Sequence, residues 1–131
     1  MEKYNKTVLI VDDDSDYLFQ MKFNVEKMGF EVITADGQKE AEELLKTTKP
    51  DLAIFDLMME NDDSGFILSY KMKKMYPDVP IILATSVAAE TGKSFSLDSE
   101  AERNWIKADL YLEKGIRFDQ LHREIMMLLK L

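Results

Sequence analysis

The stretch Leu52-Ala53-Ile54-Phe55-Asp56 is a short apolar run that ends on a single acid, and the chain is organised around it. Four consecutive apolar residues are typical of a strand that is buried on both faces. Open α/β sheets bind their ligands at the carboxyl ends of their strands, so Asp56 is a candidate functional residue. An aspartate at this place can also simply cap the next turn. The other predicted strands decide between these two interpretations.

Four further apolar runs predict the rest of a sheet, and they are Thr7–Val11, Phe30–Ala35, Ile81–Ala84 and Leu110–Glu113. Between the strands, apolar residues recur at the three- and four-residue steps of helices. The expected inner positions of these helices are Leu18, Met21, Val25 and Met28 before Gly29, then Ala41, Leu44 and Leu45, then Ile67, Leu68, Tyr70 or the Lys71 stem, Met72 and Met75, and finally Phe118, Leu121, Ile125, Leu128 and Leu129. This alternation favours a parallel sheet with right-handed crossovers.

The size and charge of the chain exclude several classes of protein. It has 131 residues, 46% of them hydrophobic, which suits one globular domain. With 25 acidic and 17 basic residues the formal charge is −8, which argues against direct binding of nucleic acid or of an anionic membrane. No apolar run approaches the roughly 20 residues of a membrane-spanning helix, and the polar start is unlike a secretory signal. We expect a single domain over residues 1–131, with no output domain, in the cytoplasm.

Polar side chains follow four of the predicted strands. Asp12 and Asp13 follow the first, Asp56 ends the third, and Thr85 and Lys114 follow the fourth and fifth. Because the carboxyl ends of parallel strands meet at one edge of a sheet, these five groups converge. Three neighbouring carboxylates repel one another, and their hard oxygen atoms suit Mg²⁺. If Asp56 is a nucleophile that becomes an aspartyl phosphate, the metal, the ammonium and the hydroxyl supply the groups that stabilise the developing charge.

These strand ends resemble the receiver domains of bacterial two-component response regulators, in particular single-domain regulators of the chemotaxis and phosphorelay type. The resemblance is carried by Val8–Asp13, Ile54–Met59, Ile82–Ser86 and Tyr111–Lys114, and it covers essentially the whole chain. It implies a flavodoxin-like, doubly wound, five-stranded parallel sheet in the order 2-1-3-4-5, with helices on both faces.

The resemblance also implies how the site works. Asp56 accepts a phosphoryl group from a histidine kinase or a phosphotransfer protein. Asp13, Asp56 and the backbone carbonyl of Met58 hold Mg²⁺, and Asp12 assists through water. Thr85 and Lys114 contact the phosphoryl group. Self-phosphorylation and slow autodephosphorylation are then the only reactions expected of the protein, which is otherwise not an enzyme.

The output and the lifetime of the phosphate follow from the same resemblance. Thr85 and Tyr111 form a switch pair, which alters the surface of the fourth helix, the Tyr111 strand and the last helix, where a downstream protein docks. In the family, side chains two residues after the acceptor and two after the hydroxyl border the path of the attacking water. Here they are Met58 and Val87, and neither can orient water by hydrogen bonding. We therefore expect slow autodephosphorylation.

Two departures from the family pattern lie beside the predicted site. Met59 is followed by Glu60 where family members commonly have proline, and Gly65 comes one residue late, so the intervening loop is remodelled. Lys114 is followed by Gly115 instead of proline. A cis bond without proline costs roughly 2.5–4 kcal/mol, so a trans bond is expected here.

The third departure is a long connection between Thr85 and Lys114. A capping-box pattern, Ser99-Glu100-Ala101-Glu102, predicts a helix from near Ser99 to near Lys107. The polar segment Glu90–Ser94 has little to bury, so it is expected to be a mobile loop.

Two other classes of function stay open. A pseudo-receiver would keep the fold and signal without phosphorylation. A small phosphatase of the haloacid dehalogenase type also uses an Asp-x-Asp nucleophile, which Asp12-Asp13-Asp14 fits, although Asp16 stands where that class has threonine or valine. A more ordinary interpretation of Asp14 and Asp16 is that they cap the first helix. The single histidine, His122, is expected at the surface.

Overall fold

Five strands and four helices occupy the part of the chain that the computed structural model describes, which is residues 4–61, 63–85 and 108–131. The elements are β1 (Thr7–Val11), α1 (Ser15–Lys27), β2 (Glu31–Ala35), α2 (Gln38–Leu45), β3 (Leu52–Asp56), α3 (Ser64–Met75), β4 (Ile81–Thr85), β5 (Leu110–Glu113) and α6 (Phe118–Leu129). Neighbouring strands are parallel, and their order is β2-β1-β3-β4-β5. This order confirms the predicted doubly wound sheet.

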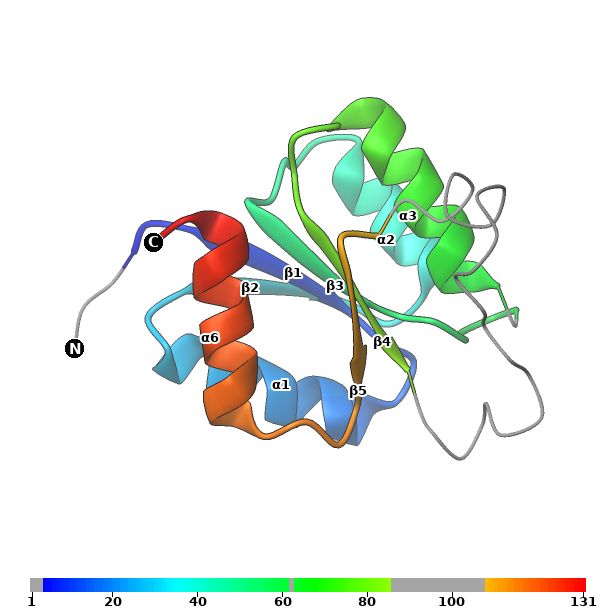
Figure 1. Cartoon of the computed structure of the whole chain (residues 1–131). Coiled ribbons are helices and arrows are strands. Elements are labelled where there is room, and N and C mark those ends of the chain that lie inside the picture. The colour runs from blue at the N-terminus through cyan, green and yellow to red at the C-terminus, as the bar shows by residue number, and fades with distance from the viewer. Residues whose placement is uncertain (1–3, 62, 86–107) are drawn as a thin grey trace, which may run out of the picture.

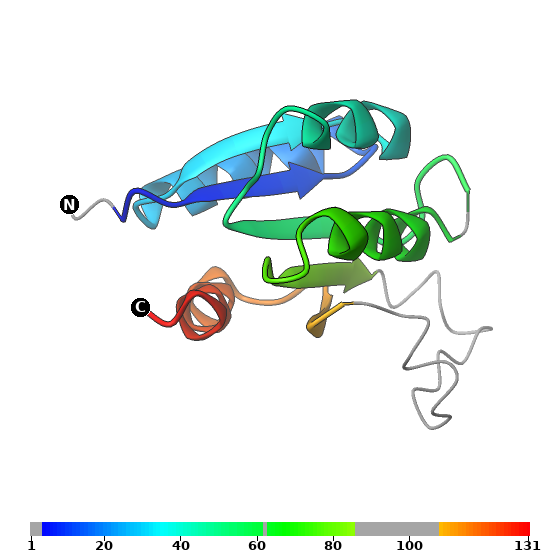
Figure 2. The ribbon, with the colours of Figure 1, turned by 90° about the horizontal axis from the view of Figure 1, so that it is seen from above.

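The sheet is covered on both faces, with α2 and α3 on one side and α1 and α6 on the other (Figures 1 and 2). Side chains alternate between the two sides because successive residues of a strand point in opposite directions. Leu9 and Phe55 belong to the core beneath α2 and α3, whereas Ile10 and Ile54 belong to the core beneath α1 and α6. Buried on both faces, β3 lies in the middle of the sheet and ends on Asp56.

Helix α1 begins and ends as the sequence predicts. The Asp14 side chain accepts hydrogen bonds from the backbone N–H groups of Asp16 and Tyr17, so it is the N-cap, and Asp16 lies in the first turn. At the other end, Gly29 has a φ of 105°. Glycine adopts this left-handed conformation without steric cost, and it lets the chain leave the helix for β2.

The structure corrects several expected details. Strand β2 begins at Glu31, and Phe30 is instead a buried core residue. Helix α3 has buried residues from its start to Met72, but Met75 at its end is exposed. Tyr70 and Phe118 are likewise exposed rather than inner residues. The periodicity of the sequence does not reveal which of these positions the fold leaves exposed.

His122 is not the surface residue that was expected. It is half-buried, its ring lies edge-on to Phe30 with 6.5 Å between centroids, and its Nε2 atom is buried. The predicted helix from Ser99 to Lys107, the predicted loop at Glu90–Ser94, and Val87 all lie outside the described residues.

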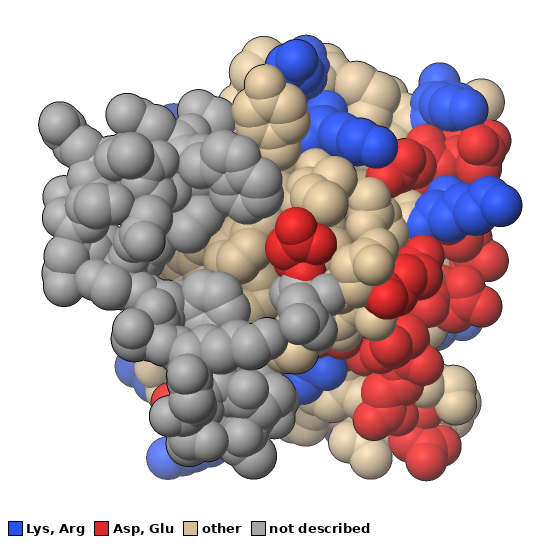
Figure 3. Space-filling model, turned by 90° about the vertical axis from the view of Figure 1, so that its right-hand side faces the viewer, with Lys and Arg blue, Asp and Glu red and all other residues tan. Residues whose placement is uncertain are grey.

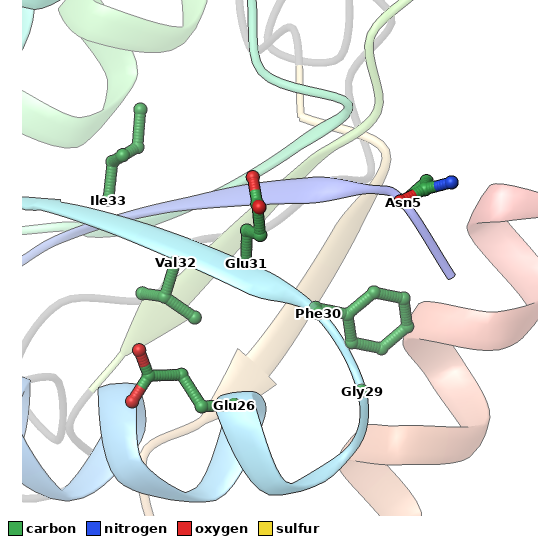
Figure 4. A pocket seen from close by; sticks show the side chains of 7 residues that line it. All are labelled: Asn5, Glu26, Gly29, Phe30, Glu31, Val32 and Ile33. Carbon is green, nitrogen blue, oxygen red and sulfur yellow. The ribbon is translucent and has the colours of Figure 1, made fainter. Parts of the chain in front are cut away.

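A cavity of about 430 Å³ lies where α1 meets β2, at the opposite end of the sheet from Asp56 (Figure 4). Glu26 and Glu31 border it together with apolar residues. Val32 points toward α1, whereas Glu31 and Ile33 point to the other side of β2. Such alternation is ordinary for a strand at the edge of a sheet. The predicted polar residues, such as Asp56, lie at the other end of the sheet.

Among the described helices, none combines the length and the apolar character needed to cross a membrane.

Candidate functional site

The register of the sheet brings the predicted polar residues together. Val11 pairs with Phe55, so the residues that follow them, Asp12 and Asp56, end neighbouring strands. Asp56 in turn pairs with Ala84, the residue before Thr85. The strands point their carboxyl ends toward the same side of the molecule (Figure 2). The predicted convergence at one edge of the sheet is therefore present in the structure.

Lys114 joins the two buried carboxylates. Its Nζ atom lies 2.8 Å from Asp12 Oδ2 and 3.1 Å from Asp56 Oδ1. Asp12 and Asp56 are 1% and 6% exposed, so both ion pairs are shielded from water. The backbone of Lys114 is fixed as well, because its N–H donates to the carbonyl of Thr85 at 2.7 Å. The Lys114–Gly115 bond is trans, as expected, since the described residues contain no cis peptide.

Burial and like charge make Asp56 hard to ionise in this state. Burial raises the pKa of Asp56 to about 7, the Asp12 carboxylate adds to the rise, and Lys114 opposes it. Burial acts to lower the pKa of Lys114. The hydrogen bonds and opposite charges of Asp12 and, to a lesser degree, Asp56 outweigh burial, so the pKa of Lys114 is raised. The cluster therefore keeps its ammonium and resists a further negative charge.

Asp12, Asp13 and Asp56 together form a candidate metal centre. Each offers a carboxylate oxygen, and the three oxygens lie within 4.8 Å of one another. The Lys114 ammonium pairs with two of these carboxylates, and a cation with hard oxygen ligands would relieve the remaining repulsion among the three. Asp13 is exposed, so it can reach a hydrated ion from the solvent side. The donor set fits Mg²⁺, which keeps several of its waters when it binds to proteins.

The other predicted residues lie on β4, on β5 and on the loop after β3. Met58 lies on the loop directly after β3 and is half-buried against the core beneath α2 and α3. Thr85 is 8% exposed, and its hydroxyl donates to the carbonyl of Leu112 at 3.4 Å. The half-buried Tyr111 ring lies against Phe66, with 6.3 Å between centroids. Thr85 therefore borders the site but directs its hydroxyl to the neighbouring strand.

Gly65 allows α3 to start against the end of β3. Its N–H donates to the carbonyl of Leu57 at 2.8 Å. A Cβ atom at this position would lie 2.5 Å from the backbone oxygen of Asp56 and 2.8 Å from Leu57 Cα. Only glycine fits beside this backbone without a shift.

Glu60, on the loop after β3, caps the N-terminus of helix α2. Its Oε1 atom accepts from the N–H of Gln38 at 2.8 Å, and Oε2 accepts from Lys39 at 3.0 Å. Gly37, at the N-cap position, offers no side chain and leaves room for this carboxylate. Burial acts to raise the pKa of Glu60, but the two backbone bonds outweigh it and lower the pKa. The loop after Asp56 is thus tied to α2.

We expect Glu60→Ala to lower the free energy of unfolding by about 1 kcal/mol, because α2 loses its N-terminal acceptor. Urea unfolding at pH 7 measures this change. The matched control is Glu43→Ala, which removes an exposed glutamate of the same helix whose partner is Lys46 at 3.0 Å, and this variant should change stability by less than about 0.5 kcal/mol. Equal losses in the two variants would contradict the capping role.

Tyr17 is a site residue that the sequence interpretation missed. Its ring centroid lies 4.9 Å from Lys114 Nζ, within the range of a cation–π contact. Burial raises the pKa of Tyr17 to about 12, with Lys114 opposing and Asp12 and Asp56 adding to the rise. The spacing of α1 gave no signal for this contact, because Tyr17 adjoins the apolar stripe and reads as a packing residue.

Acidic side chains gather on the face toward which the strands point (Figure 3). On that face they form a band along one side (Figure 3). The band agrees with the formal charge of −8. Such a surface attracts cations and repels phosphate backbones.

Comparison with known proteins places these features in a family. The model of the response regulator receiver domain matches residues 8–126. Over 98 residues the chain is 32% identical to the alkaline phosphatase synthesis transcriptional regulatory protein PhoP of Bacillus subtilis, and over 99 residues it is 31% identical to the phosphate regulon transcriptional regulatory protein PhoB of Pseudomonas aeruginosa. These matches cover 75% and 74% of the chain but 40% and 43% of the relatives, so the chain spans about two fifths of their length.

Solved structures agree. A CheY-like receiver domain protein from Methanospirillum hungatei superimposes with a TM-score of 0.81 at 27% identity, covering 97% of this chain and 95% of that one. The response regulator TrrA from Thermotoga maritima, in complex with Mg²⁺ and BeF, superimposes with a TM-score of 0.76 at 26% identity, covering 94% and 98%.

Proposed function

Because this chain belongs to the response regulator receiver domain family, we propose that Asp56 is its phosphoacceptor and that Mg²⁺ assists the transfer. The observation that carries the proposal is the Asp12–Lys114–Asp56 arrangement at the carboxyl edge of the sheet. It places a nucleophilic carboxylate beside an ammonium that can neutralise the charge developing on a phosphoryl oxygen. The family is one of phosphorylatable regulators rather than of classical enzymes.

The proposed metal ligands are Asp13, Asp56 and the backbone carbonyl of Met58, with Asp12 acting through water. The grouping of the three carboxylates supports this set, and the homologous TrrA was solved with Mg²⁺ and BeF. When bound, the metal supplies positive charge to the phosphoryl oxygens. The chain's own contribution is to hold the carboxylates in place and to keep Lys114 against Asp56.

We further propose that Thr85 and Tyr111 form the switch. In the structure, the Thr85 hydroxyl bonds to Leu112 on β5, the strand that carries Tyr111. A phosphoryl group on Asp56 would offer that hydroxyl a stronger, charged acceptor. Movement of Thr85 toward it would break the bond to β5 and allow Tyr111 to move. The upstream partner is then a histidine kinase or phosphotransfer protein, and the downstream partner is a protein that binds the β5 side.

The test is incubation with acetyl phosphate and Mg²⁺, followed by intact mass. We expect the mass of one phosphoryl group to be added, in a bond that survives acid and is cleaved by base. Continuous release of phosphate would instead indicate a phosphatase, and no change would indicate a pseudo-receiver. Decay of the added mass after donor removal should be slow, because the apolar Met58 cannot orient a water.

A further inference from the structure

Few neighbouring atoms restrict the chain just after Lys114, which follows β5. The next residue, Gly115, is exposed, and a Cβ atom there would meet nothing within 4 Å. Here the backbone bond from Lys114 to Thr85 fixes the start of the side chain, but the ammonium lies at the end of four flexible methylene groups. The ion pairs with Asp12 and Asp56 hold it there, and a further contact can add to them.

The ring of Tyr17 makes such a further contact. It lies 4.9 Å from the Lys114 Nζ atom, measured to the ring centroid, while the two carboxylate oxygens lie at 2.8 and 3.1 Å. An aromatic face attracts a cation through its quadrupole and gains most where the cation has lost water. The Lys114 side chain is only 22% exposed, so this attraction is weakly screened. An aliphatic residue could fill the same space but would not attract the ammonium.

Tyr17 is itself fixed in two ways. Its N–H donates to the Asp14 cap at 3.2 Å, which sets the start of α1. Its ring packs against the buried core beneath α1 and α6, whose members include Met21 and Ile54. The ring is therefore held by the fold before any ligand binds, and it can position a flexible partner at low entropic cost.

We propose that Tyr17 is a positioning residue of the transfer site, whose ring face holds the Lys114 ammonium against Asp12 and Asp56. The inference rests on the proposed function. In this inference the Tyr17 ring contacts the ammonium and the hydroxyl has no role, so a variant that removes only the hydroxyl tests it. Tyr17→Phe keeps the ring, whereas Tyr17→Leu keeps an apolar side chain but removes the ring face.

The experiment compares wild type, Tyr17→Phe, Tyr17→Leu and a control, Tyr4→Leu, in Mg²⁺ buffer. Tyr4 packs on the same core but stacks on Phe30, at 5.1 Å between centroids, so its loss reports on stability alone. Two properties are measured: the rate of phosphorylation by acetyl phosphate, and the NMR shifts of the Lys114 ε-protons, which a ring at this distance moves upfield.

We expect Tyr17→Leu to react about fivefold more slowly and to lose the upfield shift, while Tyr17→Phe stays within about twofold of wild type and keeps the shift. Tyr4→Leu should keep both. Equal rates for wild type and Tyr17→Leu, a slow Tyr17→Phe, or an unshifted Lys114 in wild type would each overturn the inference alone. If no protein takes up phosphate, wild type included, the proposed function itself fails, and the role of Tyr17 in transfer fails with it.

Discussion

Asp56→Asn is expected to abolish phosphate uptake from acetyl phosphate, because the amide keeps the shape of the side chain but removes the nucleophile and one metal charge. Intact mass after incubation with Mg²⁺ measures the loss. The matched control is Asp51→Asn, at the other end of the same stretch of chain, where Asp51 accepts from the N–H of Thr7 at 2.8 Å. This control should still be phosphorylated. Retention of phosphate by Asp56→Asn would point to a different acceptor.

The same variant should be more stable than wild type when metal is absent. Burial raises the pKa of Asp56 from 3.8 to about 7, so the folded state holds its proton more tightly than the unfolded state does. Asp56 therefore costs no stability below about pH 4, costs progressively more as the pH rises from 4 to 7, and costs a constant amount above that. At pH 8 in chelator, we expect Asp56→Asn to gain about 1–2 kcal/mol.

Urea unfolding from pH 4 to pH 8 tests the sign of this effect. The gain of Asp56→Asn over wild type should be largest at pH 8 and should disappear near pH 4. A gain that stays constant with pH would show that the raised pKa of Asp56 is not its cause. Such a result would leave the phosphoacceptor assignment intact, since that assignment rests on the loss of phosphate.

Gly65→Ala is expected to cause the largest loss of stability, about 2–3 kcal/mol. The added Cβ would lie 2.5 Å from the backbone oxygen of Asp56, 2.8 Å from Leu57 Cα and 3.0 Å from Leu83 Cδ2. Two of these atoms belong to the backbone and cannot rotate away, so the start of α3 or the end of β3 must move. Because this shift also displaces Asp56, phosphorylation should slow together with the loss of stability.

The control is Gly115→Ala, whose Cβ would meet nothing within 4 Å. Neither Gly65 nor Gly115 has a positive φ, since Gly29 is the one described glycine that does. The two substitutions therefore differ in the space available to the added Cβ atom, and neither is strained by its φ angle. Thermal unfolding should show a melting temperature lower by about 10 °C for Gly65→Ala and nearly unchanged for Gly115→Ala. Similar values for the two variants would contradict the steric explanation.

The sequence by itself determined the strands of the sheet and the convergence of the predicted site residues at one edge. The order of the strands followed from the family resemblance. Runs such as Leu52–Asp56 are apolar throughout, as strands covered on both faces must be, and parallel strands then bring their carboxyl ends together. Asp12, Asp56 and Lys114 accordingly lie in contact in the structure. Local signals also located the Asp14 cap and the Gly29 helix end, because these depend on a few neighbouring residues.

Only the tertiary structure revealed the contacts between distant segments. Glu60 caps a helix that begins 22 residues earlier in the chain, and Tyr17 meets Lys114 across the sheet edge. Neither pairing has a periodic signature, since each depends on how α1, α2 and the loop after β3 are placed in space. The burial of His122 and the exposure of Met75 were missed for the same reason. Periodicity reports which face of a helix is apolar, but packing decides how far along the helix that face is covered.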